Sequence, residues 1–185
     1  MDQAVAELRK GLKIEPLSAE ILLMLPFPLY LERNYAAAEA AGAVAIQAHP
    51  DFWALYMGRG YAYLAEGRFR EAIADFEKGR ALNPEATVNL AGLAASYARS
   101  GNRSEGTKVL AALQAMKSRR YVSPFDLAVV YESFGDSAQA LDCLDQAYHD
   151  NSEMMLFLDL YPPLAGLRAN PRFRELVRRV GVAPK

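Results

Sequence analysis

Few side chains in this 185-residue sequence have the types and spacing that catalysis or metal binding requires. The two histidines, His49 and His149, lie one hundred residues apart, and with the single cysteine, Cys143, they make no recognisable metal-binding set. For His49, which precedes Pro50, an exposed turn histidine is a better interpretation than a ligand. For Cys143, an inert and partly buried thiol is a better interpretation than a reactive one. We therefore predict no metal and no cofactor.

Other polar groups fit a structural explanation better than a catalytic one. The segment Gly58-Arg59-Gly60 follows no strand and opens no phosphate-binding loop, so helix packing explains its glycines. Asp142 and Asp145 stand at helical spacing, but nothing beside them indicates shared acid–base work. The arginines between positions 172 and 179 could contact phosphate, although a solvated helix face is the simpler interpretation. We predict that the chain is not an enzyme.

Charge and hydropathy exclude two classes of partner. The net charge is −1, from 21 Lys and Arg against 22 Asp and Glu, so no global field attracts nucleic acid or anionic lipid. The longest apolar run, residues 21–31, contains Pro26 and Pro28 and is shorter than the roughly 20 residues that span a membrane. We expect no nucleic-acid binding and no membrane contact. The single cysteine suits a cytoplasmic location, and the alternative is a periplasmic one if a membrane helix lies upstream.

The elements that position these side chains follow from a 34-residue period. Small residues recur at Ala4, Ala38, Ala72, Gly106 and Ala140. Turn residues recur at Gly67, Gly101 and Gly135, with Arg33 one period earlier. Prolines recur at Pro16, Pro50 and Pro84. Such a period indicates a stack of equivalent supersecondary units.

Each period contains two helical patterns, as residues 51–64 and 69–82 illustrate. Gly67 can take the left-handed conformation that closes the first helix, and Pro84 cannot continue the second. Two helices joined by so short a turn must lie antiparallel, and a single hairpin cannot bury its own apolar face. The sequence therefore predicts an all-α stack of about ten or eleven helices.

This pattern resembles the tetratricopeptide repeat over about residues 2–150. In the second repeat the matching residues are Tyr56, Gly60, Tyr63, Ala72, Phe76 and Pro84. The resemblance implies a right-handed α-solenoid and a non-catalytic role in binding a protein or peptide. We predict one domain over residues 1–185, with a partial repeat at 2–16, repeats at 19–52, 53–86, 87–120 and 121–154, and a capping segment at 155–185.

Departures from the repeat lead to further expectations. Pro26 and Pro28 should kink or break the first helix of the first repeat. Arg59 stands where the family prefers leucine, so it should reach solvent or find a carboxylate. After the fourth repeat we expect one short helix over residues 153–160. A final helix should then be capped by Asn170 and closed by Gly181.

The C-terminal part, about residues 119–181, resembles the repeat region of bacterial multidomain regulators. The residues that carry this resemblance are 121–128, 140–148 and the closing Leu167-Arg168-x-Asn170-Pro171-Arg172-Phe173. The group includes winged-helix transcriptional activators of the membrane-anchored pH-sensor type, adenylate cyclases and serine/threonine kinases. The resemblance implies a regulatory or sensory module. We expect the chain to be part of a longer protein, and the alternative is a partner that supplies a missing first helix.

In the resembled family the first helices line the concave face, which gives the candidate partner-binding residues. These are Leu23, Met24, Phe27, Tyr30, Leu31, Met57, Tyr61, Leu64, Phe125 and Val129. An apolar surface with methionine and tyrosine suits an amphipathic helix, an apolar segment or a second copy of the chain. The alternative is that the chain's own ends cover part of this face. We expect docking at the N-terminal half, where the apolar side of Val5, Leu8 and Leu12 should be exposed.

Overall fold

The computed structural model describes residues 2–181, and within them it contains eleven α-helices, two 3-10 helices and no strand. The expected all-α class is confirmed. The chain divides into two compact units, residues 1–92 and 93–185, each of which is described by itself. The division falls inside helix α7 (Thr87–Arg99). The single-domain interpretation stays a prediction.

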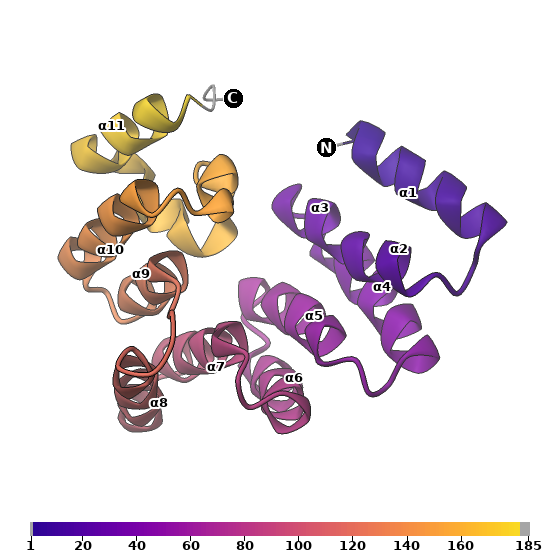
Figure 1. Ribbon diagram of the computed structural model, residues 1–185, viewed down its shortest axis with the longest axis horizontal. Coiled ribbons are helices and arrows are strands. Elements are labelled where there is room, and N and C mark those ends of the chain that lie inside the picture. The colour runs from indigo at the N-terminus through magenta and orange to yellow at the C-terminus, as the bar shows by residue number, and fades with distance from the viewer. Residues whose placement is uncertain (1, 182–185) are drawn as a thin grey trace. The chain divides into compact units, whose positions relative to one another are not determined.

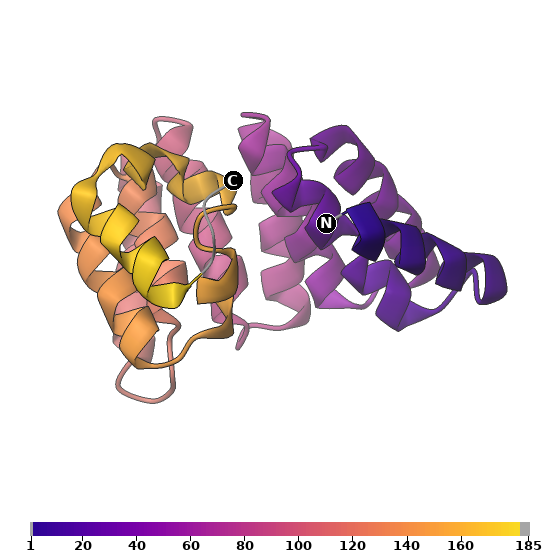
Figure 2. The same cartoon turned by 90° about the horizontal axis from the view of Figure 1, so that it is seen from above.

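The first unit consists of helices that pack on their neighbours in the sequence (Figure 1). They are α1 (Asp2–Ile14), α2 (Ala19–Met24), α3 (Pro26–Leu31), α4 (Tyr35–Ala48), α5 (Trp53–Ala65), α6 (Phe69–Leu82) and the start of α7. Helices α5 and α6 form one hairpin, and α2, α3 and α4 form the preceding one. Helix α1 lies at the edge of the unit and packs on α2 and α3 (Figures 1 and 2).

The turns between the two helices of each hairpin share one backbone conformation. Residues at the recurring turn position have positive φ angles, which are 61° at Arg33, 76° at Gly67, 86° at Gly101 and 77° at Gly135. Glycine adopts this left-handed region without steric cost, whereas an arginine is strained there by the contact of its Cβ with the backbone. The turn residues that recur every 34 positions therefore share one backbone conformation, and the first hairpin adopts it with an arginine in place of glycine.

The prolines of the first repeat split its first helix in two, as expected. Helix α2 ends at Met24 and α3 begins at Pro26, with Leu25 between them still in the helical region at φ −62° and ψ −39°. The break is short because Pro26 occupies the first position of a new helix, where its missing N–H would have no partner within the helix. Pro26 and Pro28 are both buried, so the split helix still packs on the core.

Small residues set the close approach of the helices in the first unit. Ala38 and Ala72 are fully buried on the second helices of their hairpins. A Cβ at Gly60 would lie 3.0 Å from the ring of Phe76, and a Cβ at Gly92 would overlap the same ring. Phe76 is fully buried and fills the space between α5, α6 and the start of α7. The recurring small residues are thus positions of helix contact, as the spacing predicted.

The second unit contains the end of α7, three further helices and the C-terminal segment. Its elements are α8 (Arg103–Met116), α9 (Pro124–Ser133), α10 (Ser137–His149), the 3-10 helices η1 (Glu153–Phe157) and η2 (Pro162–Ala169), and α11 (Pro171–Val180). Ser123 caps α9 by accepting a hydrogen bond from the N–H of Asp126 at 3.3 Å. Asn170 caps α11 by accepting from the N–H of Arg172 at 2.9 Å, and Gly181 closes it at φ 77°.

The segment between α10 and α11 differs from the expected single helix over residues 153–160. It forms η1, a turn, and then η2, which begins at Pro162-Pro163. Consecutive prolines lack the N–H groups that would connect this segment to a preceding α-helix, and Gly166 disfavours a regular one. Leu158, Leu164 and Leu167 of the segment are buried, so it is part of the core of its unit.

Candidate functional site

The ten candidate partner-binding residues separate into two groups by burial. Six are buried, with at most 4% of their surface exposed: Tyr30, Leu31, Tyr61, Leu64, Phe125 and Val129. These six belong to the cores of their units and present little surface to a partner. The other four, Leu23, Met24, Phe27 and Met57, keep exposed surface, and Met24 is 58% exposed.

A series of aromatic contacts explains why Tyr30 and Tyr61 are buried. The ring of Tyr30 on α3 lies 5.9 Å from that of Tyr35 and 6.2 Å from that of Tyr61 on α5. The ring of Tyr61 in turn meets Phe76 on α6 edge to face, with centroids 5.1 Å apart. Rings in such tilted and edge-on arrangements stabilise a core beyond their buried area. Helical spacing placed these tyrosines on the first helices but did not show that they pack on one another.

The four residues that keep exposed surface come from three helices: Leu23 and Met24 from α2, Phe27 from α3 and Met57 from α5. Gly58 on α5 faces Pro26, since a Cβ built at Gly58 would make an ordinary van der Waals contact with the Cβ of Pro26 at 3.9 Å. Phe27 follows Pro26 directly, Met24 lies two residues before it, and Met57 precedes Gly58. Leu23 packs against the core cluster of Leu22, Ala45 and Leu55 and remains half-buried. We call Leu23, Met24, Phe27 and Met57 the first-helix face.

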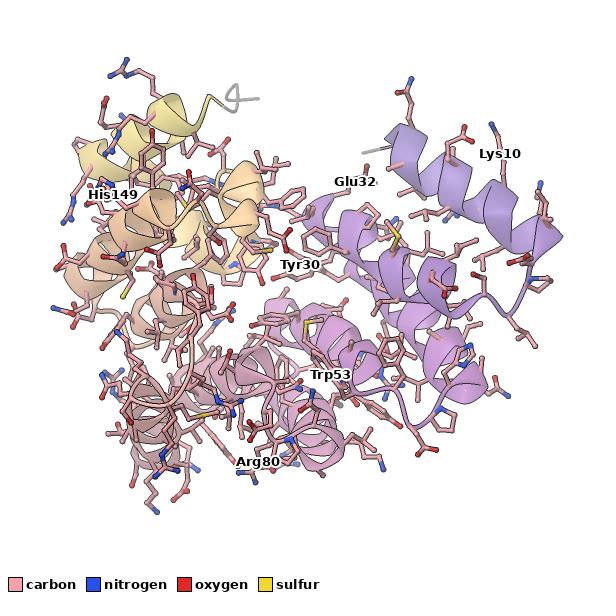
Figure 3. All side chains as sticks on the ribbon, viewed as in Figure 1. Lys10, Tyr30, Glu32, Trp53, Arg80 and His149 are labelled. Carbon is pink, nitrogen blue, oxygen red and sulfur yellow. The ribbon has the colours of Figure 1, made fainter. Side chains whose placement is uncertain are left out.

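Trp53 extends this face and was missed in the sequence. It opens α5 four residues before Met57 and is half-buried (Figure 3). Residues four apart lie on the same side of a helix, so Trp53 and Met57 are neighbours. The spacing alone could have identified it, since the side of α5 that carries Met57 is fixed once Met57 is assigned.

A partly buried ion pair joins α5 to α6. Arg59 donates two hydrogen bonds to Asp75, from Nε to Oδ2 at 2.7 Å and from Nη2 to Oδ1 at 2.8 Å. Asp75 is buried, and its hydrogen bonds raise the pKa of Arg59. Gly42 leaves room for the arginine stem, because a Cβ at Gly42 would lie 3.0 Å from the Cβ of Arg59. The expected carboxylate partner of Arg59 is therefore present.

A second arginine connects the two hairpins of the first unit at their turns. Arg68 donates to Glu39 on α4 at 2.7 Å and to Glu71 on α6 at 3.0 Å, and its guanidinium lies 4.4 Å from the centroid of the Tyr63 ring. These hydrogen bonds raise the pKa of Arg68, and the same arginine lowers the pKa of Glu71. Both clusters are structural, because their charges are neutralised within the unit.

In the second unit the chain's own C-terminal segment covers the corresponding first helix. Phe125 on α9 meets Tyr161 edge to face, with ring centroids 5.1 Å apart, and η2 packs along α9. A Cβ at Gly166 of η2 would overlap the carboxylate of Glu132 on α9. Phe125 and Val129 are thereby enclosed. Asp126, next to Phe125, is half-buried, and desolvation raises the pKa of its carboxyl to about 7.

The last helix is held by charges that the sequence did not connect. Arg172 on α11 donates to Asp142 at 2.6 Å and to Asp145 at 3.0 Å, both on α10. Arg179 lies with its guanidinium 4.3 Å from the centroid of the Tyr148 ring and 3.5 Å from Asp145. The arginines of α11 are at the surface, as expected, but two of them are bound to α10. Asp142 and Asp145 thus have a shared role, which is to hold α11.

The described residues contain no group of three or more His, Cys, Asp or Glu side chains that could hold a metal ion. Across residues 2–181, no helix is long and apolar enough to cross a membrane. Cys143 is half-buried, and burial raises the pKa of its thiol, which lowers the fraction of reactive thiolate.

With this geometry established, comparison with known proteins gives the following results. Residues 53–86 match the family model described as tetratricopeptide repeat. These are the bounds expected for the second repeat, and they contain α5 and α6. No curated protein matches the sequence.

Solved structures are similar to the fold. A thermophilic tetratricopeptide repeat protein of Thermus thermophilus has a TM-score of 0.66 at 21% identity, covering 89% of this chain and 90% of its own. A tetratricopeptide repeat protein of Parabacteroides merdae has a TM-score of 0.55 at 14% identity, covering 98% and 72%. A chain in the Naa15/Naa10 structure bound to HypK-THB has a TM-score of 0.51 at 17% identity, covering 94% and 28%.

These likenesses show the fold. The chain folds as an α-solenoid of helical repeats, and the expected all-α solenoid fold is confirmed. This fold is generally a non-catalytic scaffold for protein–protein interaction.

Proposed function

We propose that the chain binds an apolar or amphipathic protein segment on its first-helix face, formed by Leu23, Met24, Phe27 and Met57. One observation carries the proposal. Met24 is 58% exposed at a position where the next two repeats have Gly58 and Gly92 and the following one has Asp126. At this position of the repeat, a large apolar side chain stands at the surface only in the first repeat.

The chemistry of the face defines its partner. Methionine side chains are flexible and polarizable and adapt to apolar partners of different shape. Phe27 and Trp53, both half-buried, add aromatic surface on α3 and α5. No charged residue belongs to the face, so an acidic or basic peptide has nothing there to pair with. A helix with apolar residues at positions i, i+3 or i+4, and i+7 matches such a surface.

We further propose that this binding module belongs to a bacterial signalling or transcription-regulating protein, in which it has a regulatory or sensory role. The support is the sequence resemblance of residues 119–181 to the repeat region of bacterial multidomain regulators. We propose a cytoplasmic location, with periplasmic attachment to an upstream membrane helix as the alternative. The genomic sequence upstream of Met1 tests this context. An output domain in the same reading frame is the expected result, and a ribosome-binding site directly before Met1 would contradict it.

Selection of displayed peptides on the purified chain tests the binding proposal. We expect enriched peptides with helical apolar spacing, whose affinity falls at least about tenfold, a loss of roughly 1.4 kcal/mol, in Met24→Glu and Met57→Glu. Both side chains keep exposed surface, so the circular dichroism of these variants should be unchanged. Tyr30 is unsuitable for this test, because its buried ring belongs to the aromatic core.

The matched control is Leu156→Glu, which places the same charge at an apolar residue that is 60% exposed in the second unit. It should leave peptide binding unchanged. The proposal would be wrong if the peptides still bound both methionine variants but lost binding to Arg174→Ser or Arg178→Ser.

A further inference from the structure

One contact recurs in the first unit where a second helix packs against the first helix of the next repeat. A small residue of the second helix packs there with the residue ten positions later in the sequence. The residues at these positions are Gly11 and Ile21, Ala45 and Leu55, and Gly79 and Asn89. Two of the three contacts place an aliphatic side chain against the small residue. The third, between α6 and the start of α7 (Figure 1), places an amide there.

The second unit contains no second case of this kind among its described residues. The residues equivalent to Asn89 are Ser123 and Phe157, and both are half-buried. Ser123 caps α9 by accepting a hydrogen bond from the N–H of Asp126, so its hydroxyl has a partner. Of the five equivalent residues, Asn89 alone is both polar and fully buried.

The amide of Asn89 is buried without a hydrogen-bond partner. Its side chain is 0% exposed, and among the described residues no group donates to its Oδ1 or accepts from its Nδ2. The amide fits because its neighbour is glycine, since a Cβ at Gly79 would lie 2.6 Å from Oδ1 and 3.0 Å from Nδ2. Burying an amide without a hydrogen bond costs free energy, which is recovered when the amide returns to water. The closed contact between α6 and α7 therefore carries a penalty that is absent once the contact opens.

The preceding contact, between α4 and α5, has an apolar residue at the same place. Leu55 is 2% exposed and packs in one core cluster with Ala45 and Leu22. Arg68 also joins the α5–α6 hairpin to α4 through its hydrogen bond to Glu39 at 2.7 Å. This contact should therefore stay closed under conditions in which the contact at Asn89 opens.

We propose that the contact between α6 and α7 is a seam at which the first unit opens, with residues 87–92 releasing from α6 while α4, α5 and α6 stay packed. In a stack of repeats each contact between neighbours adds its own contribution to stability, so one weakened contact determines where opening begins. The division between the two compact units falls directly after residue 92, three residues beyond Asn89. Release uncovers the ring of Phe76, which is fully buried and packs against Gly92. The seam uses no residue of the first-helix face, so this proposal and the proposed function can fail separately.

Native-state hydrogen exchange of the whole chain, followed by NMR, tests the seam. The reporters are the amides of residues 91–93, which bond to the carbonyls of residues 87–89 in an α-helix, and the equivalent amides of residues 57–59 in α5. Each stretch contains one glycine, Gly92 or Gly58, at the same place. The opening constant at residues 91–93 should be at least about tenfold larger than at residues 57–59. Equal constants would overturn the proposal, and this comparison requires no variant.

Asn89→Leu tests whether the buried amide is the cause, because leucine has the same branching at Cγ and no polar side-chain atom. It should lower the opening constant at residues 91–93 by at least about tenfold. Val88→Leu is the matched control, because it gives a similar gain in helix propensity at a half-buried neighbour and leaves the amide in place. It should change the opening constant by less than about threefold. Equal effects of the two variants would show that helix propensity limits the opening and would contradict the proposal.

Leu55→Asn is the reciprocal change and should create a second seam between α4 and α5. It should raise the opening constant at residues 57–59 by at least about tenfold. The constant at residues 91–93 should stay unchanged, because these residues open without disturbing the contact between α4 and α5. A rise of the same size in both stretches would show that the unit opens as a whole, and the proposed seam would then be wrong.

Discussion

Helices α1 and α11, the first and last helices of the described chain, pack differently within their own units. At the C-terminal end, η2 covers α9 through Tyr161, and Arg172 attaches α11 to Asp142 and Asp145. In the N-terminal unit, α1 packs on α2 and α3. Val5 is buried and Leu8 and Leu12 are half-buried, although the sequence predicted this side to be exposed, whereas Ile14 and Leu17 are 82% and 69% exposed. The outer face of α11 is thus polar, and the end of α1 has apolar surface.

The sharpest test of this difference compares one apolar residue from each end. Phe173→Ala in α11 removes a side chain that is 1% exposed, so it should destabilise the protein by about 3–5 kcal/mol. Ile14→Ala should change the free energy of unfolding by less than about 0.5 kcal/mol in dilute monomeric protein. Urea unfolding of both variants measures the two effects. Equal losses would mean that α1 is as enclosed as α11.

The enclosed C-terminal end should also show in the pH dependence of stability. Burial raises the pKa of Asp126 from 3.8 to about 7, so the folded state binds a proton that the unfolded state has released between those values. The free energy of unfolding therefore falls as pH rises from about 4 to about 7, by up to about 1.4 kcal/mol for each pH unit.

Asp126→Asn should remove that loss. Between pH 4 and pH 7, the unfolding temperature of the variant should rise relative to that of the wild type. Above pH 7, the difference between the two unfolding temperatures should stay constant. Thermal unfolding at several pH values measures it, with the exposed Asp51→Asn as control. A difference between Asp126→Asn and wild type that does not vary with pH would show that the carboxyl is ionised throughout.

A smaller effect is expected at the turn of the first repeat. Arg33 holds a φ of 61° where the next three repeats have glycine. Arg33→Gly should stabilise the protein by about 1 kcal/mol by relieving the left-handed strain. Gly67→Ala, at φ 76°, is the reciprocal change and should destabilise by a similar amount. Chemical denaturation compares the two, and an Arg33→Gly variant less stable than wild type would show that the arginine side chain compensates for its backbone.

The smallest expected effect concerns the charges of the two end helices. Arg172 bridges α11 to α10, so Arg172→Ala should cost about 0.5–1 kcal/mol at low salt and less at high salt. Lys10 pairs only within its own exposed helix turn, and Lys10→Ala should have no measurable effect on the stability of the monomer. Salt titration of unfolding midpoints tests the contrast, which fails if both variants respond alike.

The sequence predicted well those features that depend on local backbone chemistry. The breaks at Pro26 and Gly67, the caps at Ser123 and Asn170, and the bounds of the second repeat follow from residue types that restrict φ or lack an N–H. The carboxylate partner of Arg59, which is Asp75, was expected because a charge inside a repeat must be compensated. A few consecutive residues, or one 34-residue period, are enough to predict these features.

Features that depend on contacts between distant segments were not predictable. Helical spacing placed Tyr61 and Phe125 on the first helices, but burial by Phe76 and Tyr161 depends on how other elements pack over them. Asp142 and Asp145 acquire their role only when α11 brings Arg172 to them. The 3-10 conformation of residues 162–169 likewise follows from packing on α9 as well as from its prolines.

The most direct test of the central claim, that a protein segment binds the first-helix face, is amide hydrogen exchange of the purified chain with and without a selected peptide. The account predicts added protection in α2, α3 and the start of α5 when the peptide is bound, with exchange in η2 and α11 unchanged. Added protection in η2 or α11, with α2, α3 and α5 unaffected, would contradict it.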